Sequence, residues 1–72
     1  MYEVRVSGDT PISKVRLCLK ELEAKTLWCS FDIKNSTIRV DGVHSNPDDV
    51  MGTVISKIGI DNIDWFGDPS MA

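Results

Sequence analysis

The chain has 72 residues, a length that allows one small domain. Its formal net charge is −3, which argues against a nucleic-acid partner, because surfaces that bind a nucleic-acid backbone are strongly basic. No run of about 18 apolar residues is present, so we expect no membrane-spanning helix and no membrane partner. The first residues, MYEVRV, have no basic n-region and no apolar h-region, so we expect no secretory signal. Two cysteines are too few for a disulfide scaffold and favour a reducing, cytoplasmic location.

The first two predicted elements follow from the spacing of apolar residues. Residues 2–7 alternate between apolar and polar side chains, which predicts a strand with one buried face. Residues 11–25 have helical spacing. The apolar positions expected on the buried side of this helix are Ile12, Val15, Cys18, Leu19 and Leu22. Leu17 falls on the opposite side, and we expect it to be partly exposed.

A hairpin and a second helix are predicted next. Residues 27–33 and 37–41 alternate again across a polar turn, a pattern typical of an antiparallel hairpin. The inward positions of its first strand are Leu27, Cys29, Phe31 and Ile33. Helical spacing then runs to about Ile58, and Gly59 follows as a stop signal. The apolar face of this second helix is Val50, Met51, Val54, Ile55 and Ile58.

A short last strand at residues 63–66 completes the order β-α-β-β-α-β. This order predicts an α+β fold, the ferredoxin-like sandwich, with two helices on one face of a four-stranded antiparallel sheet. The expected spatial strand order is fourth, first, third, second. We assign residues 1–66 to this domain and residues 67–72 to a flexible tail.

Both predicted helices follow an N-cap residue and a proline. Thr10-Pro11 and Asn46-Pro47 would each place a capping side chain before a proline at the first helical position, where the missing N–H has no cost. The second of these helices also has acidic residues in its first turn, which suit the positive end of the helix dipole.

The segment from Gly8 to Val15, GDTPISKV, resembles the metal loop of the heavy-metal-associated domain. That family comprises copper chaperones, metal-transport ATPases and their plant relatives. In it, a strand is followed by Gly-Met-Thr-Cys-x-x-Cys-Val and a helix, and Gly8, Thr10 and Val15 match without a gap. The segments SFDIKNSTIRVDG and NPDDVMGTVISKIG extend the resemblance to about residues 2–66. The fold that the family implies is the same sandwich.

The chain departs from this family at the two metal ligands. Pro11 and Lys14 stand where the family has cysteines. Proline has no ligand atom, and the lysine brings positive charge to a site where a soft cation needs sulfur. We therefore expect no metal and no other cofactor. Cys18 and Cys29 are expected on core-facing positions as small hydrophobes, and a soft-metal (copper) binding or chaperone function that uses these two thiols is the alternative.

No catalytic residues are expected. His44 lies in a predicted loop without an evident acid–base partner, and Asp48 and Asp49 are expected to be helix-start charges. Ser13 and Ser45 lack the sequence signature of an activated nucleophile. A small-molecule regulatory domain that binds its ligand between subunits is a further alternative, for which the sequence offers no positive sign.

Alternation assigns a set of polar and aromatic side chains to the sheet face away from the helices. Its expected members are Glu3, Arg5, Trp28, Ser30, Asp32, Thr37, Arg39, Asp41 and Asp64, with Phe66 added if the last strand keeps its register. A tryptophan among mixed charges is typical of an interface with an aromatic anchor. Trp65 is expected at the rim of the core. The candidate partner-binding residues are Trp28, Ser30, Asp32, Arg39, Asp41, Glu3 and Arg5.

We therefore expect a non-catalytic protein-interaction module that exists as a monomer or weak dimer. The resemblance to the heavy-metal-associated domain also implies a kind of partner, which the residues alone do not indicate. Copies of the heavy-metal-associated domain that have lost their metal site are integrated in plant immune receptors, where they act as decoys for pathogen effectors. The partner implied by that likeness is a pathogen effector protein, bound through the open sheet face and the edge strands.

Overall fold

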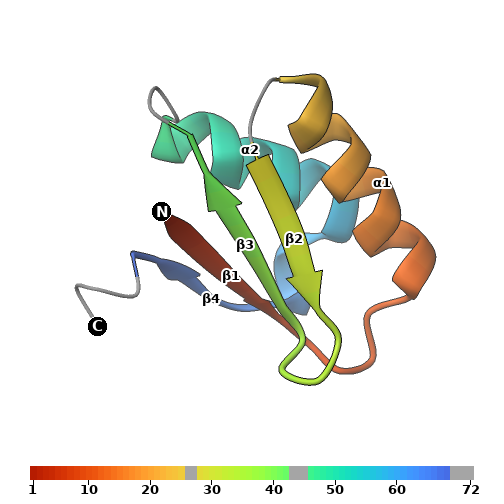
Figure 1. Cartoon of the computed structure of the whole chain (residues 1–72). Helices are drawn as coiled ribbons and strands as arrows, with labels where there is room; N and C mark the ends of the chain where they lie inside the picture. The colour runs from red at the N-terminus through yellow and green to blue at the C-terminus, as the bar shows by residue number, and fades with distance from the viewer. Residues whose placement is uncertain (26–27, 43–45, 69–72) are drawn as a thin grey trace.

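The computed structural model describes residues 1–25, 28–42 and 46–68. In chain order the elements are β1 (Tyr2–Val6), α1 (Ile12–Ala24), β2 (Trp28–Asp32), β3 (Thr37–Asp41), α2 (Pro47–Ile58), the short 3-10 helix η1 (Ile60–Asn62) and β4 (Ile63–Gly67). The strands form one antiparallel sheet in the order β2-β3-β1-β4, and both helices cover the same face of it (Figure 1). The predicted ferredoxin-like sandwich and its strand order are confirmed.

The core lies between the helices and the two central strands. Alternate residues of β1 and β3 are buried, as are one stripe of α1 and one stripe of α2. The buried apolar residues are Val4, Val6, Val15, Cys18, Leu22, Ile38, Val40, Val50, Val54 and Ile58. Cys29 and Phe31 of the edge strand β2 are only partly buried against this core, because an edge strand has neighbours on one side only.

Helix α2 begins as its sequence predicts. The side chain of Asn46 accepts a hydrogen bond from the backbone N–H of Asp48 at 2.9 Å, and Pro47 is the first helical residue. The helix ends at Gly59, whose φ of 95° lies in the left-handed region that favours glycine.

Helix α1 does not begin as predicted. Its N-cap residue is Pro11, and no side chain caps it. The N–H of Thr10 instead bonds to the carbonyl of Ser7 at 3.0 Å in a turn that precedes the helix. Thr10 therefore lies one residue too early to cap, and within the described chain its buried hydroxyl has no hydrogen-bond partner.

The end of β2 also differs from the expectation. Ile33, predicted to point inward, is 76% exposed, because the strand ends at Asp32. The carboxylate of Asp32 accepts hydrogen bonds from the backbone N–H and the side-chain amide of Asn35, and these contacts turn the chain before Ile33 can continue the alternation. Leu27, also predicted inward, lies outside the described residues.

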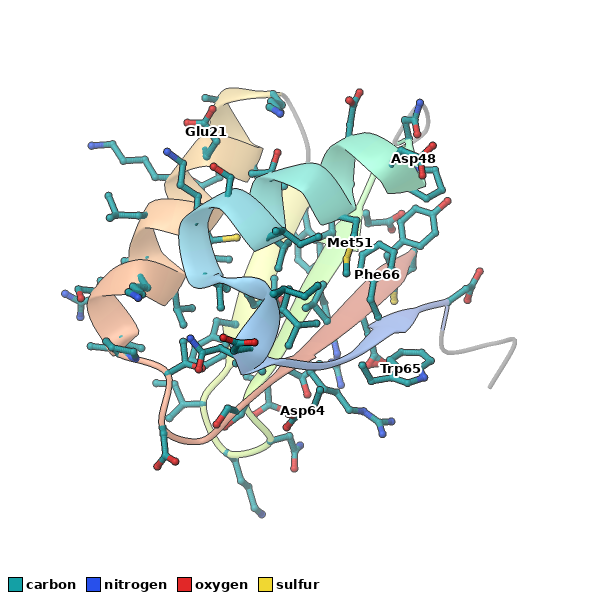
Figure 2. The ribbon with its side chains drawn as sticks, turned by 180° about the vertical axis from the view of Figure 1, so that it is seen from behind. Glu21, Asp48, Met51, Asp64, Trp65 and Phe66 are labelled. Atoms are coloured by element: carbon teal, nitrogen blue, oxygen red, sulfur yellow. The ribbon has the colours of Figure 1, made fainter. Side chains whose placement is uncertain are left out.

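A β-bulge in β4 overturns the expected facing of its aromatic residues. Arg5 pairs with Trp65, but the next residue of β1, Val6, pairs with Ile63, so Asp64 is an extra residue on β4. One extra residue reverses the in-out alternation beyond it. Ile63 and Phe66 therefore both pack against the core, and Trp65 points away from the helices rather than lying at the core rim (Figure 2). The strand extends to Gly67, one residue beyond its predicted end.

Candidate partner-binding surface

The open sheet face, which we define as the face away from the two helices, brings the seven candidate residues together. The strand register forms cross-strand rows on it. The first row is Trp28 and Asp41, the second is Ser30, Arg39 and Glu3, and the third is Asp32, Thr37, Arg5 and Trp65. The predicted placement is confirmed, whereas their role in binding stays a prediction. Trp65 is the member that the sequence did not indicate.

Trp28 is the most prominent apolar group of this face. Its side chain is 59% exposed at the start of β2, opposite Asp41. A tryptophan this exposed leaves a large apolar surface in water that the fold itself does not cover. The expected exposure of Leu17 is also confirmed, at 57%, but Leu17 lies on α1.

Strand β2 forms one edge of the sheet, and among the described strands it pairs only with β3. The backbone groups on its other side are therefore not used by the sheet. Such an edge can accept an added strand from another chain. Trp28 begins this edge, so an aromatic anchor and an open strand edge coincide at one place on the molecule.

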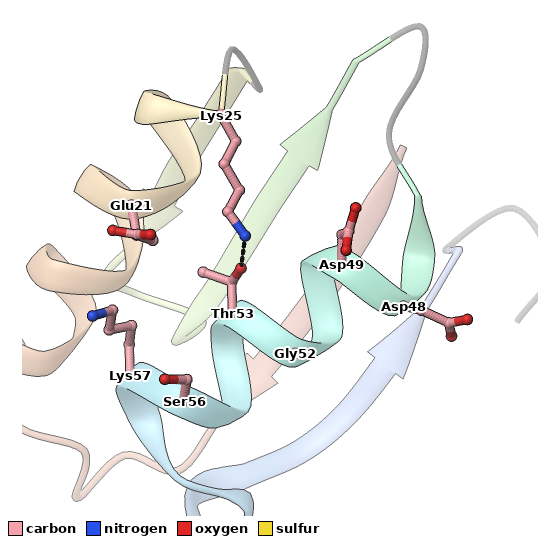
Figure 3. A pocket seen from close by; sticks show the side chains of 8 residues that line it. All are labelled: Glu21, Lys25, Asp48, Asp49, Gly52, Thr53, Ser56 and Lys57. Atoms are coloured by element: carbon pink, nitrogen blue, oxygen red, sulfur yellow. Dashed lines mark hydrogen bonds between the residues drawn. The ribbon is translucent and has the colours of Figure 1, made fainter.

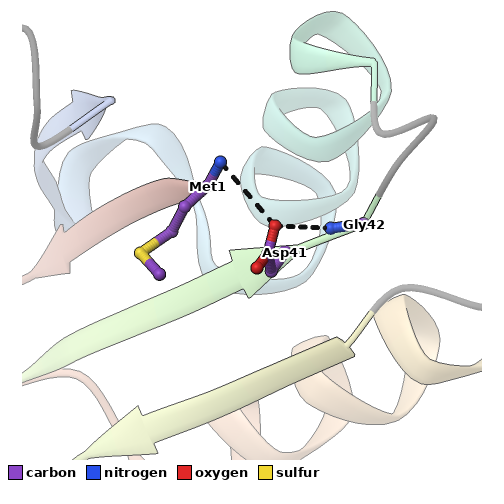
Figure 4. A network of polar contacts seen from close by, with 3 residues as sticks. All are labelled: Met1, Asp41 and Gly42. Atoms are coloured by element: carbon purple, nitrogen blue, oxygen red, sulfur yellow. Dashed lines mark hydrogen bonds and ion pairs between the residues drawn. The ribbon is translucent and has the colours of Figure 1, made fainter.

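Two acidic residues of the face already have partners. Asn35 holds the pKa of the Asp32 carboxyl below its ordinary value, mainly through its side-chain hydrogen bond at 2.8 Å. Asp41 accepts a hydrogen bond from the N–H of Gly42 at 2.9 Å and lies 3.8 Å from the amino terminus of Met1 (Figure 4). These carboxylates serve the hairpin and the chain terminus, so they contribute less to a partner site than the sequence alone implies.

Arg5 is held by an aromatic contact. Its guanidinium carbon lies 5.1 Å from the centroid of the Trp65 ring, within the range of a cation–π interaction. The indole can lie this close to the strand because residue 67 is a glycine: a Cβ at Gly67 would be 2.9 Å from the Trp65 ring. The two residues of β4 therefore fix the position of an arginine on β1.

The degenerate metal-motif positions Pro11 and Lys14 are both exposed, one at the end of the turn and the other in the first turn of α1. Cys18 is fully buried, and Cys29 is half-buried with its thiol 3.5 Å from the carbonyl of Leu19. Burial raises the pKa of Cys18 to about 11 and also raises the pKa of Cys29. Because soft metals bind the thiolate, these shifts weigh against a copper site at the two cysteines.

Within residues 1–25, 28–42 and 46–68, no three His, Cys, Asp or Glu side chains gather as metal ligands would. His44 and Ser45, considered above as catalytic candidates, lie outside the described residues.

On the side of the molecule away from the open sheet face, a groove lies between α1 and α2 (Figure 3). Its volume is about 290 Å³, and its walls are mostly charged or hydroxyl side chains of both helices. Lys25 crosses the groove and donates a hydrogen bond to the hydroxyl of Thr53 at 2.8 Å. Helical periodicity did not indicate this groove, because its walls come from the outward faces of two separate helices.

None of the helices in the described part of the chain has the length and apolar character needed to cross a lipid bilayer. Comparison of the chain with family models, curated proteins and solved structures gave no match.

Proposed function

We propose that this chain is a non-catalytic protein-interaction module that binds a partner protein through its open sheet face and the free edge of β2. The observation that carries the proposal is the 59% exposed side chain of Trp28 on an edge strand, beside a face of mixed charge. An exposed tryptophan supplies much contact area at a low cost in side-chain entropy, and residues of this type dominate binding energy at protein interfaces.

The neighbouring side chains support specificity rather than affinity. Around Trp28 the open sheet face carries both acidic and basic groups, and β3 and β1 hold them on rigid strands. Charged groups around an apolar centre fix the orientation of a partner and reject poorly matched ones. The face therefore combines an anchor with a polar surround, the usual anatomy of a protein interface.

The resemblance of residues 8–15 to a metal loop supports a narrower form of this proposal. In this form the chain is a heavy-metal-associated-like domain that has lost its metal site, with Pro11 and Lys14 in place of the ligands. It would serve as an integrated decoy in a plant immune receptor, inside the cell, and its partner would be a pathogen effector.

The test uses two exposed apolar residues of nearly equal exposure on different faces. Pathogen effector proteins are assayed singly for binding to the wild-type chain, and affinity is then measured for Trp28→Ala and for the control Leu17→Ala. We expect Trp28→Ala to weaken binding by about 2 kcal/mol, roughly thirtyfold, and Leu17→Ala to leave it unchanged. Equal effects of the two substitutions, or no effect of Trp28→Ala, would place the interface elsewhere.

A further inference from the structure

We propose that the hollow between Arg5 and Arg39 on the open sheet face is a subsite for a carboxylate group, supplied by an aspartate or glutamate side chain of the partner protein. This inference rests on the proposed function, since it names the chemistry of one contact of that partner. The hollow measures about 330 Å³ and is lined by Glu3, Arg5, Asn35, Thr37 and Arg39.

The strand register places the two arginines as diagonal neighbours. Arg5 is opposite Thr37 and Arg39 is opposite Glu3, so the two arginines stand on adjacent strands two positions out of step. Diagonal neighbours of this kind are separated by about 7–8 Å at the backbone, which is still within reach of long side chains. Both side chains line the same hollow, so an oxyanion placed in it would be within reach of either arginine.

Neither arginine forms an ion pair within the described chain, although Glu3 is the cross-strand partner of Arg39 and lines the same hollow. No described carboxylate lies at ion-pair distance from either guanidinium, and the ion pair found among the described residues joins the amino terminus of Met1 to Asp41. Arg39 still affects the face, because its charge contributes to the lowered pKa of Asp32. Two arginines that face one hollow without an ion-paired carboxylate match the bidentate geometry of an incoming carboxylate.

Trp65 and Gly67 restrict the position of Arg5 from β4, on the side of β1 away from Arg39, and do not themselves line the hollow. The ring of Trp65 holds the Arg5 guanidinium at 5.1 Å without cancelling its charge, and the missing side chain of Gly67 leaves room for the ring. A guanidinium held in place before binding loses less entropy when a ligand arrives. The bulge at Asp64 is what brings Trp65 to the open sheet face.

The balance of charge in the hollow favours a carboxylate over a phosphate. Arg5 and Arg39 bring two positive charges, while Glu3 on the same wall brings one negative charge. Asp32, in the row beside Arg39, adds a second negative charge at the border. These four charges sum to zero, so a carboxylate would be held by direct hydrogen bonds from the two guanidinium groups rather than by an excess of positive charge. A doubly charged phosphate would meet stronger repulsion from the two acidic residues than a singly charged carboxylate would.

The experiment titrates the isotope-labelled chain with a capped Gly-Glu-Glu-Gly peptide at low salt and follows backbone and arginine side-chain NMR signals. A matched Gly-Gln-Gln-Gly peptide and inorganic phosphate are the comparison probes. We expect shifts around Arg5, Thr37 and Arg39 with the glutamate peptide only. Equal shifts with the glutamine peptide, or tighter binding of inorganic phosphate at the same residues, would overturn the carboxylate assignment.

Variants separate this subsite from a general charge effect. We expect Arg39→Gln and Arg5→Gln each to weaken the glutamate peptide about tenfold or more. Arg16→Gln on α1 removes the same charge from an exposed site elsewhere and should have no effect. Gly67→Ala removes no charge and should also weaken binding, by displacing Trp65. Equal losses for Arg16→Gln and Arg39→Gln would overturn the inference.

The two proposals fail in different ways. If a protein partner needs Trp28 but binds the Arg5→Gln and Arg39→Gln variants as tightly as wild type, the carboxylate subsite is wrong and the proposed function stands. If the peptide binds between the arginines but no partner depends on Trp28, the proposed function is wrong at its anchor while the subsite stands.

Discussion

The two faces of the sheet are made by the same strands but have opposite chemistry. On β1 and β3, the side chains toward the helices are buried aliphatic groups, except for the partly buried Tyr2, whereas those on the open sheet face are charged or polar, such as Glu3, Arg5 and Arg39. Because side chains alternate along a strand, one face can supply the stability of the domain while the other remains available for recognition. Substitutions on the two faces should therefore affect different measurements.

The largest expected effect lies on the helix-covered face. Leu22→Ala should lower the free energy of unfolding by about 2–5 kcal/mol, because Leu22 is fully buried in the core and its truncation leaves a cavity. Urea denaturation monitored by circular dichroism measures this loss. Trp28→Ala, on the open sheet face, should change the unfolding free energy by less than about 0.5 kcal/mol. Similar losses of unfolding free energy for both variants would mean that the open sheet face also contributes to the stability of the domain.

Cys18 gives the next largest effect and makes the core sensitive to alkaline pH. Its pKa is raised from 9.0 to about 11, mainly by burial, so the folded state favours the neutral thiol. The resulting stability is fully present below pH 9 and is lost as pH rises through about 11. The loss is on the order of 2 kcal/mol.

The measurement is urea denaturation of wild type and Cys18→Ala across that pH range, where the Cys18→Ala chain should lack this part of the pH dependence. Parallel curves for the two proteins would show that the Cys18 thiol does not titrate with a raised pKa in the folded state.

The two helix starts offer a comparison within the molecule. Asn46→Ala should lower the unfolding free energy by about 1 kcal/mol, because Asn46 caps α2 through the N–H of Asp48. Thr10→Ala should cost less than the loss of a cap, since the Thr10 hydroxyl makes no hydrogen bond with the described chain. Equal losses in thermal or urea denaturation would indicate that Thr10 caps α1 after all.

The smallest expected effect concerns copper. A titration with monovalent copper and a competing chelator, under reducing conditions, should show no tight one-to-one binding, because both thiols are held in the protonated form by burial. The Cys18→Ser/Cys29→Ser double variant should behave like wild type. Tight binding that the double variant loses would support the alternative of a soft-metal domain.

Apolar periodicity predicted the sandwich and its strand order, because both follow from the order of the helices and strands. Each of these elements is recognised from the spacing of several apolar residues, so one misplaced residue does not change the prediction. Two of the misplaced details depend on a local contact, whereas Ile12 and Ile55, expected on the buried faces of the two helices, are 47% and 37% exposed. The Asn35–Asp32 hydrogen bonds end β2 before Ile33, and the Ser7–Thr10 turn removes the cap of α1. The open sheet face was predictable on β1, β2 and β3, whose alternation is regular. Trp65 was not, since the bulge that turns it outward leaves no periodic sign in the sequence.

The measurement that tests the central claim most directly is NMR chemical-shift mapping of the chain bound to a partner protein. The account predicts that the largest changes fall on the open sheet face and along β2, centred on Trp28, and that the groove between α1 and α2 is unaffected. Changes that cluster instead in that groove, around Lys25 and Thr53, with the Trp28 signals unmoved, would contradict it.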